Sequence, residues 1–213
     1  MTFLPPRIFG RTNELVTPVW RERADGSAID AGDWLVLPIT PDSLDRRPQV
    51  ALQERLATLG RRRADVLLLT DILASELKIG WPMHRMQQLR EQGLCRYFAI
   101  ETFEPLEAEW ITANAPVHAV IVPYTPTDMA IRYRTFEAGR VGGVALLARS
   151  ATREETALHL GTPELCATIT SADRVESIAP ASSDTVNALW ETYRAIHPEP
   201  KKLRSGHPPD YGV

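Results

Sequence analysis

Apolar runs without alternation recur along the chain, and each is followed by a stretch with helical spacing. An uninterrupted apolar run is typical of a strand covered on both faces, whereas apolar positions three or four residues apart are typical of an amphipathic helix. The pattern predicts strands at 34–40, 64–70, 95–101, 117–124, 143–150 and 174–180. It predicts helices at about 42–59, 82–92, 105–113, 128–139, 152–160 and 185–196.

The alternation of strand and helix predicts a parallel sheet, arranged as a βα barrel or as a doubly wound sheet. Residues 1–20 contain two short β-type runs around turn residues, which is typical of a small hairpin, and residues 21–33 are predicted to be a loop. We expect residues 1–196 to form a single domain. The proline-rich segment 197–213 is expected to be an extended tail.

Composition argues against several classes of protein. The 213 residues include 24 Lys and Arg against 27 Asp and Glu, which gives a net charge of −3 and argues against a nucleic-acid partner. The 2 cysteines are too few for a disulfide framework, and the first residues lack the pattern of a signal peptide. The apolar runs are much shorter than the ~20 residues that a membrane span needs. We therefore expect a cytoplasmic protein with no membrane partner.

Several segments, taken in order, resemble consecutive segments of the aldo-keto reductases. FGRTNELVTPV resembles the N-terminal hairpin of that family, and LQERLATLGRRRADVLLL resembles the helix that leads into its fourth strand. The later matches are MHRMQQLREQGLCRYFAIETF, HAVIVPYT, GGVALLARS and ESIAPASSDTVNALWE, the last with the helix that holds the adenylate phosphate. The resemblance implies an α/β fold with an N-terminal β-hairpin and a TIM-type barrel.

The resemblance also implies that the barrel is shortened. The family has a helix, a strand and another helix where this chain has only the segment after Trp20. A barrel without its second strand unit is incomplete and leaves an open edge, which the loop 21–33, the tail or another subunit must cover. This expectation favours a homo-oligomer.

The family reduces carbonyls with a hydride from a nicotinamide cofactor and with a tyrosine, lysine, histidine and aspartate. By the resemblance, the tyrosine and aspartate belong to the missing interval, the lysine position falls at Thr40, and the histidine position falls at Thr70. The chain is thus expected to lack the catalytic tetrad.

The nicotinamide contacts of the family align with Glu101, Thr102, Ile121 and Arg149, which are poor substitutes for them. A faint phosphate motif remains at the residues Ser182, Ser183 and Asn187. We expect no cofactor, and the resemblance leaves open a vestigial NADP site.

In βα barrels the chemistry lies at the carboxyl ends of the strands. Those ends give a polar ring of Thr40, Thr70, Asp71, Glu101, Thr102, Tyr124, Thr125, Arg149 and Ser150. The predicted catalytic residues are Glu101 and Asp71 as acid and base and Tyr124 as a proton donor. The predicted substrate-binding residues are Arg149, as an anchor for an anion, and Thr70, Thr102 and Ser150.

Each of these residues also has a structural interpretation. Glu101 and Arg149 can form a salt bridge that closes the pocket, Asp71 can cap a helix, and Tyr124 can be part of the core. The histidines and cysteines show no metal-binding spacing, so no metal site is predicted.

Three functions follow. The first is non-redox acid–base chemistry, of the lyase, dehydratase, isomerase or cyclase type, on a small anionic or carbonyl metabolite. The second is a non-catalytic pseudoenzyme that binds or regulates a protein partner, and the third is a residual NAD(P)H-dependent carbonyl oxidoreductase.

Overall fold

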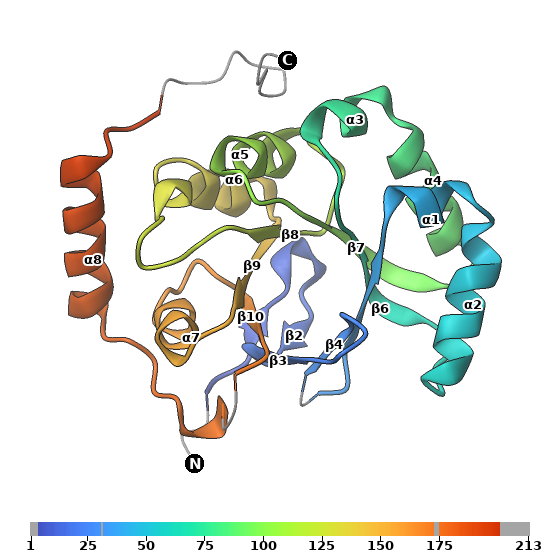
Figure 1. Ribbon diagram of the computed structural model, residues 1–213, viewed down its shortest axis with the longest axis horizontal. Helices are drawn as coiled ribbons and strands as arrows, with labels where there is room; N and C mark the ends of the chain where they lie inside the picture. Colours follow the sequence, from blue (N-terminus) through green and yellow to red (C-terminus); the bar gives the residue numbers. More distant parts are fainter. Residues whose placement is uncertain (1–3, 31, 173–174, 201–213) are drawn as a thin grey trace.

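Among the residues that the structure describes, eight short strands close into a barrel (Figure 1). The computed structural model describes residues 4–30, 32–172 and 175–200. The barrel strands are β3 (Val19–Glu22), β4 (Ala28–Asp30), β5 (Leu35–Ile39), β6 (Ala64–Leu69), β7 (Cys95–Glu101), β8 (Ala119–Val122), β9 (Ala145–Ser150) and β10 (Ala167–Thr170). Their order around the barrel is β10-β3-β4-β5-β6-β7-β8-β9. The prediction of a TIM-type barrel is confirmed, and the doubly wound sheet is excluded.

The helices lie outside the barrel and follow the parallel strands (Figure 1). They are α1 (Pro41–Asp45), α2 (Pro48–Thr58), α3 (Ala74–Ile79), α4 (Trp81–Glu91), α5 (Pro105–Asn114), α6 (Thr135–Gly142), α7 (Arg153–Leu160) and α8 (Ser183–Ile196). None of the described helices combines the length and apolar character that a bilayer span requires. Helix α8 ends at the boundary predicted for the domain, and most of the predicted tail, 201–213, lies outside the described residues.

The segment 21–33 corrects two of the sequence predictions. Residues 21–30 are not a loop, because they continue β3, turn tightly and return as β4, which pairs antiparallel with both β3 and β5, while Ala31 lies outside the described residues. In the turn, Asp25 accepts hydrogen bonds from the backbone N–H and the hydroxyl of Ser27, and Gly26 has a φ of +75°. Asp-Gly is a strong hairpin signal. The barrel is therefore shortened but not incomplete, and the open edge on which the homo-oligomer prediction rested does not exist.

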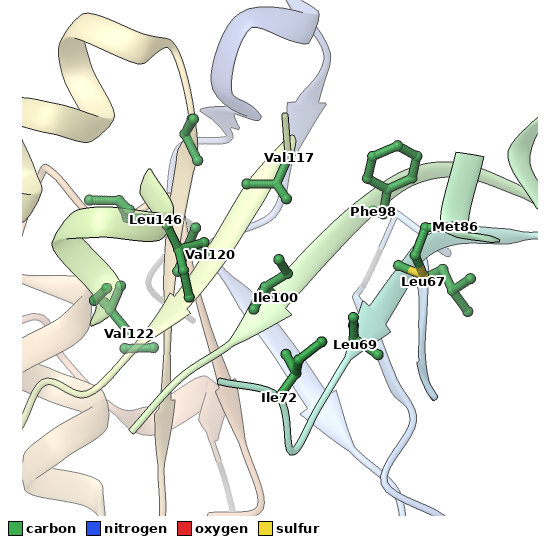
Figure 2. Packing of buried hydrophobic residues seen from close by; sticks show 14 of the residues in the cluster. Leu67, Leu69, Ile72, Met86, Phe98, Ile100, Val117, Val120, Val122 and Leu146 are labelled. Carbon is green, nitrogen blue, oxygen red and sulfur yellow. The ribbon is translucent and has the colours of Figure 1, made fainter. Parts of the chain in front are cut away.

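Two hydrophobic layers stabilise the barrel, because successive side chains of a strand point to opposite faces. The outer layer joins the strands to the helices, and Figure 2 shows Leu67, Ile100 and Val120 of this layer on three neighbouring strands. The inner layer fills the barrel with residues such as Leu68 and Ile121.

The hairpin of β1 (Arg7–Ile8) and β2 (Leu15–Val16) covers the amino-terminal end of the barrel. Phe9 is fully buried there against Trp20 and Trp34, with ring centroids 6.1 and 5.3 Å away. Gly10 allows the hairpin to approach the backbone before β9 closely, since a Cβ on Gly10 would lie 2.6 Å from the carbonyl oxygen of Gly143. The predicted hairpin is therefore confirmed, and it closes the amino-terminal end of the barrel, so we call it the hairpin plug.

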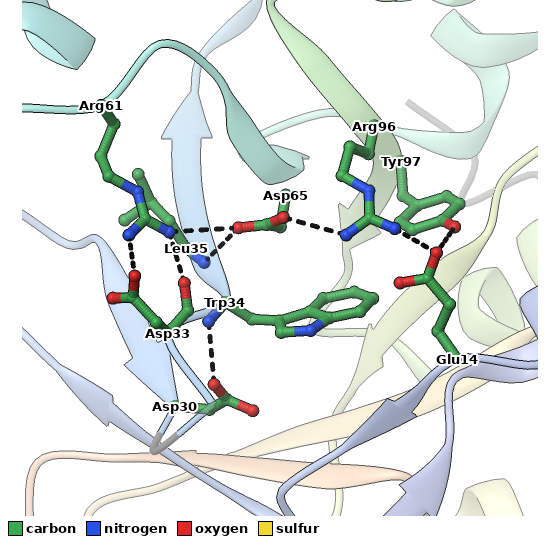
Figure 3. Close-up of polar contacts among 9 residues, drawn as sticks. All are labelled: Glu14, Asp30, Asp33, Trp34, Leu35, Arg61, Asp65, Arg96 and Tyr97. Carbon is green, nitrogen blue, oxygen red and sulfur yellow. Dashed lines mark hydrogen bonds and ion pairs between the residues drawn. The ribbon is translucent and has the colours of Figure 1, made fainter.

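Charged residues fasten this plug to the strands (Figure 3). Glu14 of the hairpin accepts hydrogen bonds from the Tyr97 hydroxyl, at 2.7 Å, and from Arg96. Arg96 also bonds to Asp65, at 3.3 Å, and its guanidinium lies 5.1 Å from the centroid of the Trp34 ring. The network links the hairpin to β6 and β7 at the end of the barrel that is opposite to the predicted site.

The last predicted strand, 174–180, is wrong. The eighth barrel strand is β10, at Ala167–Thr170, and the described part of 174–180 contains a 3-10 turn at Val175–Ser177. Val175 and Ile178 are both buried and lie three residues apart, which is the period of a 3-10 turn rather than of a strand. Arg174 lies outside the described residues.

Helix boundaries differ from the predictions at several points, and α6 continues through Gly139 to Gly142. Pro48 begins α2 separately from α1, and Arg47 before it has a φ of +52°. Thr40 caps α1, and Ser182, rather than Ser183 or Asp184, caps α8. The predicted helix 128–139 is a 3-10 turn at Ala130–Arg132 followed by α6.

The contribution of Asp30 to the stability of the closed barrel can be tested by substitution. Its buried carboxylate accepts hydrogen bonds from the Trp34 backbone N–H, at 2.9 Å, and from the backbone and hydroxyl of Thr17. Asp30→Asn places N–H groups against these donors and should lower the free energy of unfolding by about 2 kcal/mol. The matched control Asp33→Asn removes an exposed carboxylate and should cost less than about 1 kcal/mol. Equal losses in urea titrations would contradict this role for Asp30.

His118 should make stability depend on pH. Burial, aided by Arg90 and Arg11, lowers its pKa from 6.5 to about 4, and its Nδ1 accepts a hydrogen bond from the Phe98 N–H. The unfolded chain therefore binds the extra proton first, so the free energy of unfolding should fall as the pH drops from 6.5 toward 4. His118→Gln keeps an acceptor but does not titrate. Its urea midpoint should fall less than that of the wild type over this range, and parallel curves would contradict the prediction.

Candidate functional site

Three charged side chains point inward at the carboxyl end of the barrel. Strand alternation places Glu22 of β3, Glu101 of β7 and Arg149 of β9 on the inner face, in the same rows as the apolar residues of the inner layer. Since parallel strands end at the same side, these residues come together at the barrel mouth.

The three residues form one ion-pair network, which we call the mouth triad. The Nε and Nη2 atoms of Arg149 bond to the two carboxylate oxygens of Glu101, the second at 3.3 Å, and Nη1 bonds to Glu22. The Glu101 side chain is 6% exposed, whereas those of Arg149 and Glu22 are 27% and 28% exposed. The salt-bridge interpretation of Glu101 and Arg149 is therefore confirmed.

The triad leaves Arg149 with little capacity to hold an anionic substrate, because each of its three nitrogen atoms already faces a carboxylate. Sequence reasoning missed Glu22, since the segment after Trp20 was interpreted as a loop. The alternation Trp20, Arg21, Glu22 at the end of a strand was the available signal.

Tyr124 lies away from the mouth. It is 1% exposed in the outer layer, where its ring packs against Phe136 and His159. Its hydroxyl accepts a hydrogen bond from Arg132, at 3.3 Å, and burial raises its pKa. The structure therefore does not bring Tyr124 to Glu101.

Ser150 and Thr102 also point out of the barrel. The Ser150 hydroxyl bonds to those of Thr156 and Thr168, at 2.9 and 3.1 Å, between the barrel and α7. Thr102 donates to Glu107 of α5, at 3.1 Å. Both residues are buried and hold helices against strands.

Asp71 and Thr70 lie at the rim, after β6. Asp71 is exposed, has a φ of +54° and accepts a hydrogen bond from the Thr70 hydroxyl, at 3.2 Å. It does not cap α3, whose N-cap is Leu73 with the Glu76 carboxylate on its backbone N–H. Of the residues predicted for the site, the structure joins only Glu101 with Arg149 and Thr70 with Asp71.

The described residues contain no cluster of His, Cys, Asp or Glu that could hold a metal ion. The histidine nearest to a predicted site residue is His159, which bonds to the Tyr124 carbonyl, at 2.6 Å, and to the Thr168 hydroxyl. Burial lowers its pKa. It is thus a neutral bridge between α7 and the barrel.

Comparison with known proteins identifies the fold. No family model matches the sequence, and no curated protein sequence matches it. Among solved structures, an aldo-keto reductase from Bacillus halodurans, AKR11C1, superposes with a TM-score of 0.63 at 11% identity, over 89% of this chain and 96% of that one.

Two further structures agree. The thermostable aldo-keto reductase Tm1743, solved with the inhibitor epalrestat, has a TM-score of 0.54 at 22% identity and covers 72% of this chain and 69% of its own. An aldo-keto reductase from Klebsiella pneumoniae, solved with NADP and acetate, has a TM-score of 0.57 at 16% identity, over 79% and 71%. The fold of this chain is that of the aldo-keto reductases, as the sequence resemblance predicted.

The residues present at the mouth do not fit the nicotinamide dinucleotide that this fold implies. By the sequence resemblance Glu101 belongs to the nicotinamide contacts, and its buried carboxylate is held by Arg149. A helix N-terminus at the mouth is a natural phosphate site. At the start of α8, where the resemblance puts the phosphate motif, the Ser182 hydroxyl already accepts from the Thr185 backbone N–H, and Asp184 in the first turn would repel a phosphate. At α7 the Glu155 carboxylate accepts from the backbone N–H groups of Ala151 and Thr152, and it would repel a phosphate too.

The contribution of the mouth triad to the free energy of unfolding can be tested by substitution. Arg149→Met leaves the buried Glu101 carboxylate without a partner and should cost about 3 to 5 kcal/mol in the free energy of unfolding. The double variant with Glu101→Gln should recover a large part of this loss, because the unpaired charge is gone. Urea unfolding of the single and double variants measures the coupling. Strict additivity of the two single losses would show that the pair is not coupled.

Proposed function

We propose that this chain is a non-catalytic relative, in fold, of the aldo-keto reductases, and that it acts by binding a partner. The observation that carries the proposal is the mouth triad, in which two carboxylates hold one guanidinium at the place where the barrel would perform chemistry. In the triad these charged groups contact one another, so the guanidinium of Arg149 is already held by two carboxylates.

The geometry argues against general acid–base catalysis at Glu101. The Nε and Nη2 atoms of Arg149 contact both carboxylate oxygens of Glu101. The same contacts occupy the oxygen atoms that a general base would use. The groups expected to complete the reaction are elsewhere, with Tyr124 in the core and Asp71 exposed at the rim.

A second candidate is an NAD(P)H-dependent oxidoreductase with new catalytic residues. The specific observation in its favour is that structures similar in fold include aldo-keto reductases from Klebsiella pneumoniae solved with NADP and with NADPH. Among catalytic functions, these neighbours favour an oxidoreductase over the non-redox chemistry expected from the sequence. Fold alone does not transfer the activity, and the residues at the mouth oppose it.

The two candidates differ in a cofactor titration. We expect NADPH and NADH to show no saturable binding in calorimetry up to millimolar concentration, and no oxidation of either cofactor with simple aldehydes. Micromolar binding that Glu101→Gln alters, accompanied by aldehyde-dependent oxidation of NADPH, would overturn the proposal in favour of the oxidoreductase.

A further inference from the structure

A groove of about 990 Å³ lies beside the barrel, away from the mouth triad. Its walls come from the start of β9, from α6 and α8, and from the turn before β10, and they include Arg7, Arg132, Phe136, Glu164, Cys166 and Trp190. Its volume is in the range of small-molecule sites, which run from about 300 to 1,000 Å³. None of the residues predicted for the functional site lines it.

Arg132 is the feature that distinguishes this groove. The guanidinium lies 6.0 Å from the centroid of the Phe136 ring and 5.5 Å from that of Trp190, so aromatic rings hold it on two sides. One nitrogen atom, Nη1, donates to the neutral hydroxyl of Tyr124. Among the described residues, no carboxylate forms an ion pair with Arg132. A half-buried cation is thus left with spare N–H donors beside a cavity.

Arg7 adds a second positive charge to the wall. Its side chain donates to the backbone carbonyl oxygens of Leu160, Thr162 and Leu165, which fixes its position. These partners are neutral. Burial lowers the pKa of Arg7, and the nearby Glu164 acts in the opposite direction.

The carboxylates of the groove do not cancel these charges. Glu137 is paired with Arg140, at 2.9 Å from Nε to Oε2, and both are exposed. Glu164 is exposed at the rim. Among the described residues, neither Arg7 nor Arg132 forms an ion pair with a carboxylate, although Glu164 lies near enough to Arg7 to stabilise its charge, and an aromatic surface lies next to Arg132.

We propose that this groove binds a small organic anion with a flat apolar body, anchored through Arg132. A carboxylate, sulfonate or phosphate matches the geometry of a guanidinium fork, and the half-buried ring of Trp190 offers a surface for the body of the ligand, whereas Phe136, which is 8% exposed, mainly holds Arg132 in place. The site is separate from the barrel mouth and does not depend on the proposed function.

The probe is 2-naphthoate, with 2-naphthylmethanol as the neutral analogue and inorganic phosphate as the anion without a ring, each titrated into the full chain by calorimetry. We expect 2-naphthoate to bind in the micromolar range and both comparison compounds to bind at least about tenfold more weakly, since the anion and the ring each contribute. Failure of 2-naphthoate to bind at millimolar concentration would overturn the proposal. Equal binding of the neutral analogue would overturn it too, as apolar adsorption only.

Variants locate the site. Arg132→Gln should weaken 2-naphthoate binding at least about tenfold, whereas Arg194→Gln, which removes an exposed guanidinium of α8 that pairs with Glu191 and does not line the groove, should change it less than about twofold. If Arg132→Gln does not fold, as judged by circular dichroism, Trp190→Leu serves instead and should also weaken binding, because it removes one ring of the site. Unchanged affinity in the folded variant would overturn the assignment to this groove.

Because NADPH is itself an aromatic anion, the cofactor titration is repeated on Arg132→Gln. NADPH binding that this variant removes belongs to the groove, supports the inference and leaves the proposed function intact. NADPH binding that survives the variant belongs elsewhere and counts against the proposed function, while the 2-naphthoate result decides the groove independently.

Discussion

The closure of the barrel by one antiparallel strand is the constraint on which the rest of the structure depends. A parallel barrel that loses a strand–helix unit exposes two rows of unpaired backbone groups. Here the short strand β4 follows β3 after a tight turn and pairs with both β3 and β5, so that it satisfies both rows. The charged network at the amino-terminal end then fastens the hairpin plug to the strands around it.

Closure also determines the chemistry of the mouth. With β4 inserted, β3 stays paired with β10, and Trp20 lies opposite Ile169. The end of β3 therefore reaches the mouth next to β10, which in turn pairs with β9. Glu22 therefore meets Arg149, which already faces Glu101 from the opposite side. The charges of Glu22, Glu101 and Arg149 offset one another across the mouth. The groove lined by Arg132 is a separate site, where the guanidinium retains N–H donors beside the one that binds Tyr124.

The sequence by itself determined the layout of the barrel from residue 34 to residue 150. Uninterrupted apolar runs such as ADVLLL and helices ended by glycine are local signals, so β6, α4 and β7 appear where the pattern predicted them. The resemblance in motifs also predicted the fold of the neighbours found among solved structures. The sequence placed Glu101 and Arg149 at the carboxyl ends of two strands and left open whether they pair or act in catalysis, and the structure shows the pair.

Tertiary structure alone decided the remaining points. The strand β4 is only three residues long, which is too short to give an apolar run in the sequence. Its place in the sheet is set by pairing with β3 and β5. Tyr124 follows an apolar strand as Glu101 ends one, yet the chain turns after Val122 and directs the ring into the outer layer. Arg132 looks in sequence like any surface arginine. Its position between two rings exists only because Phe136 of α6 and Trp190 of α8, far apart in the chain, both lie beside the 3-10 turn that carries Arg132.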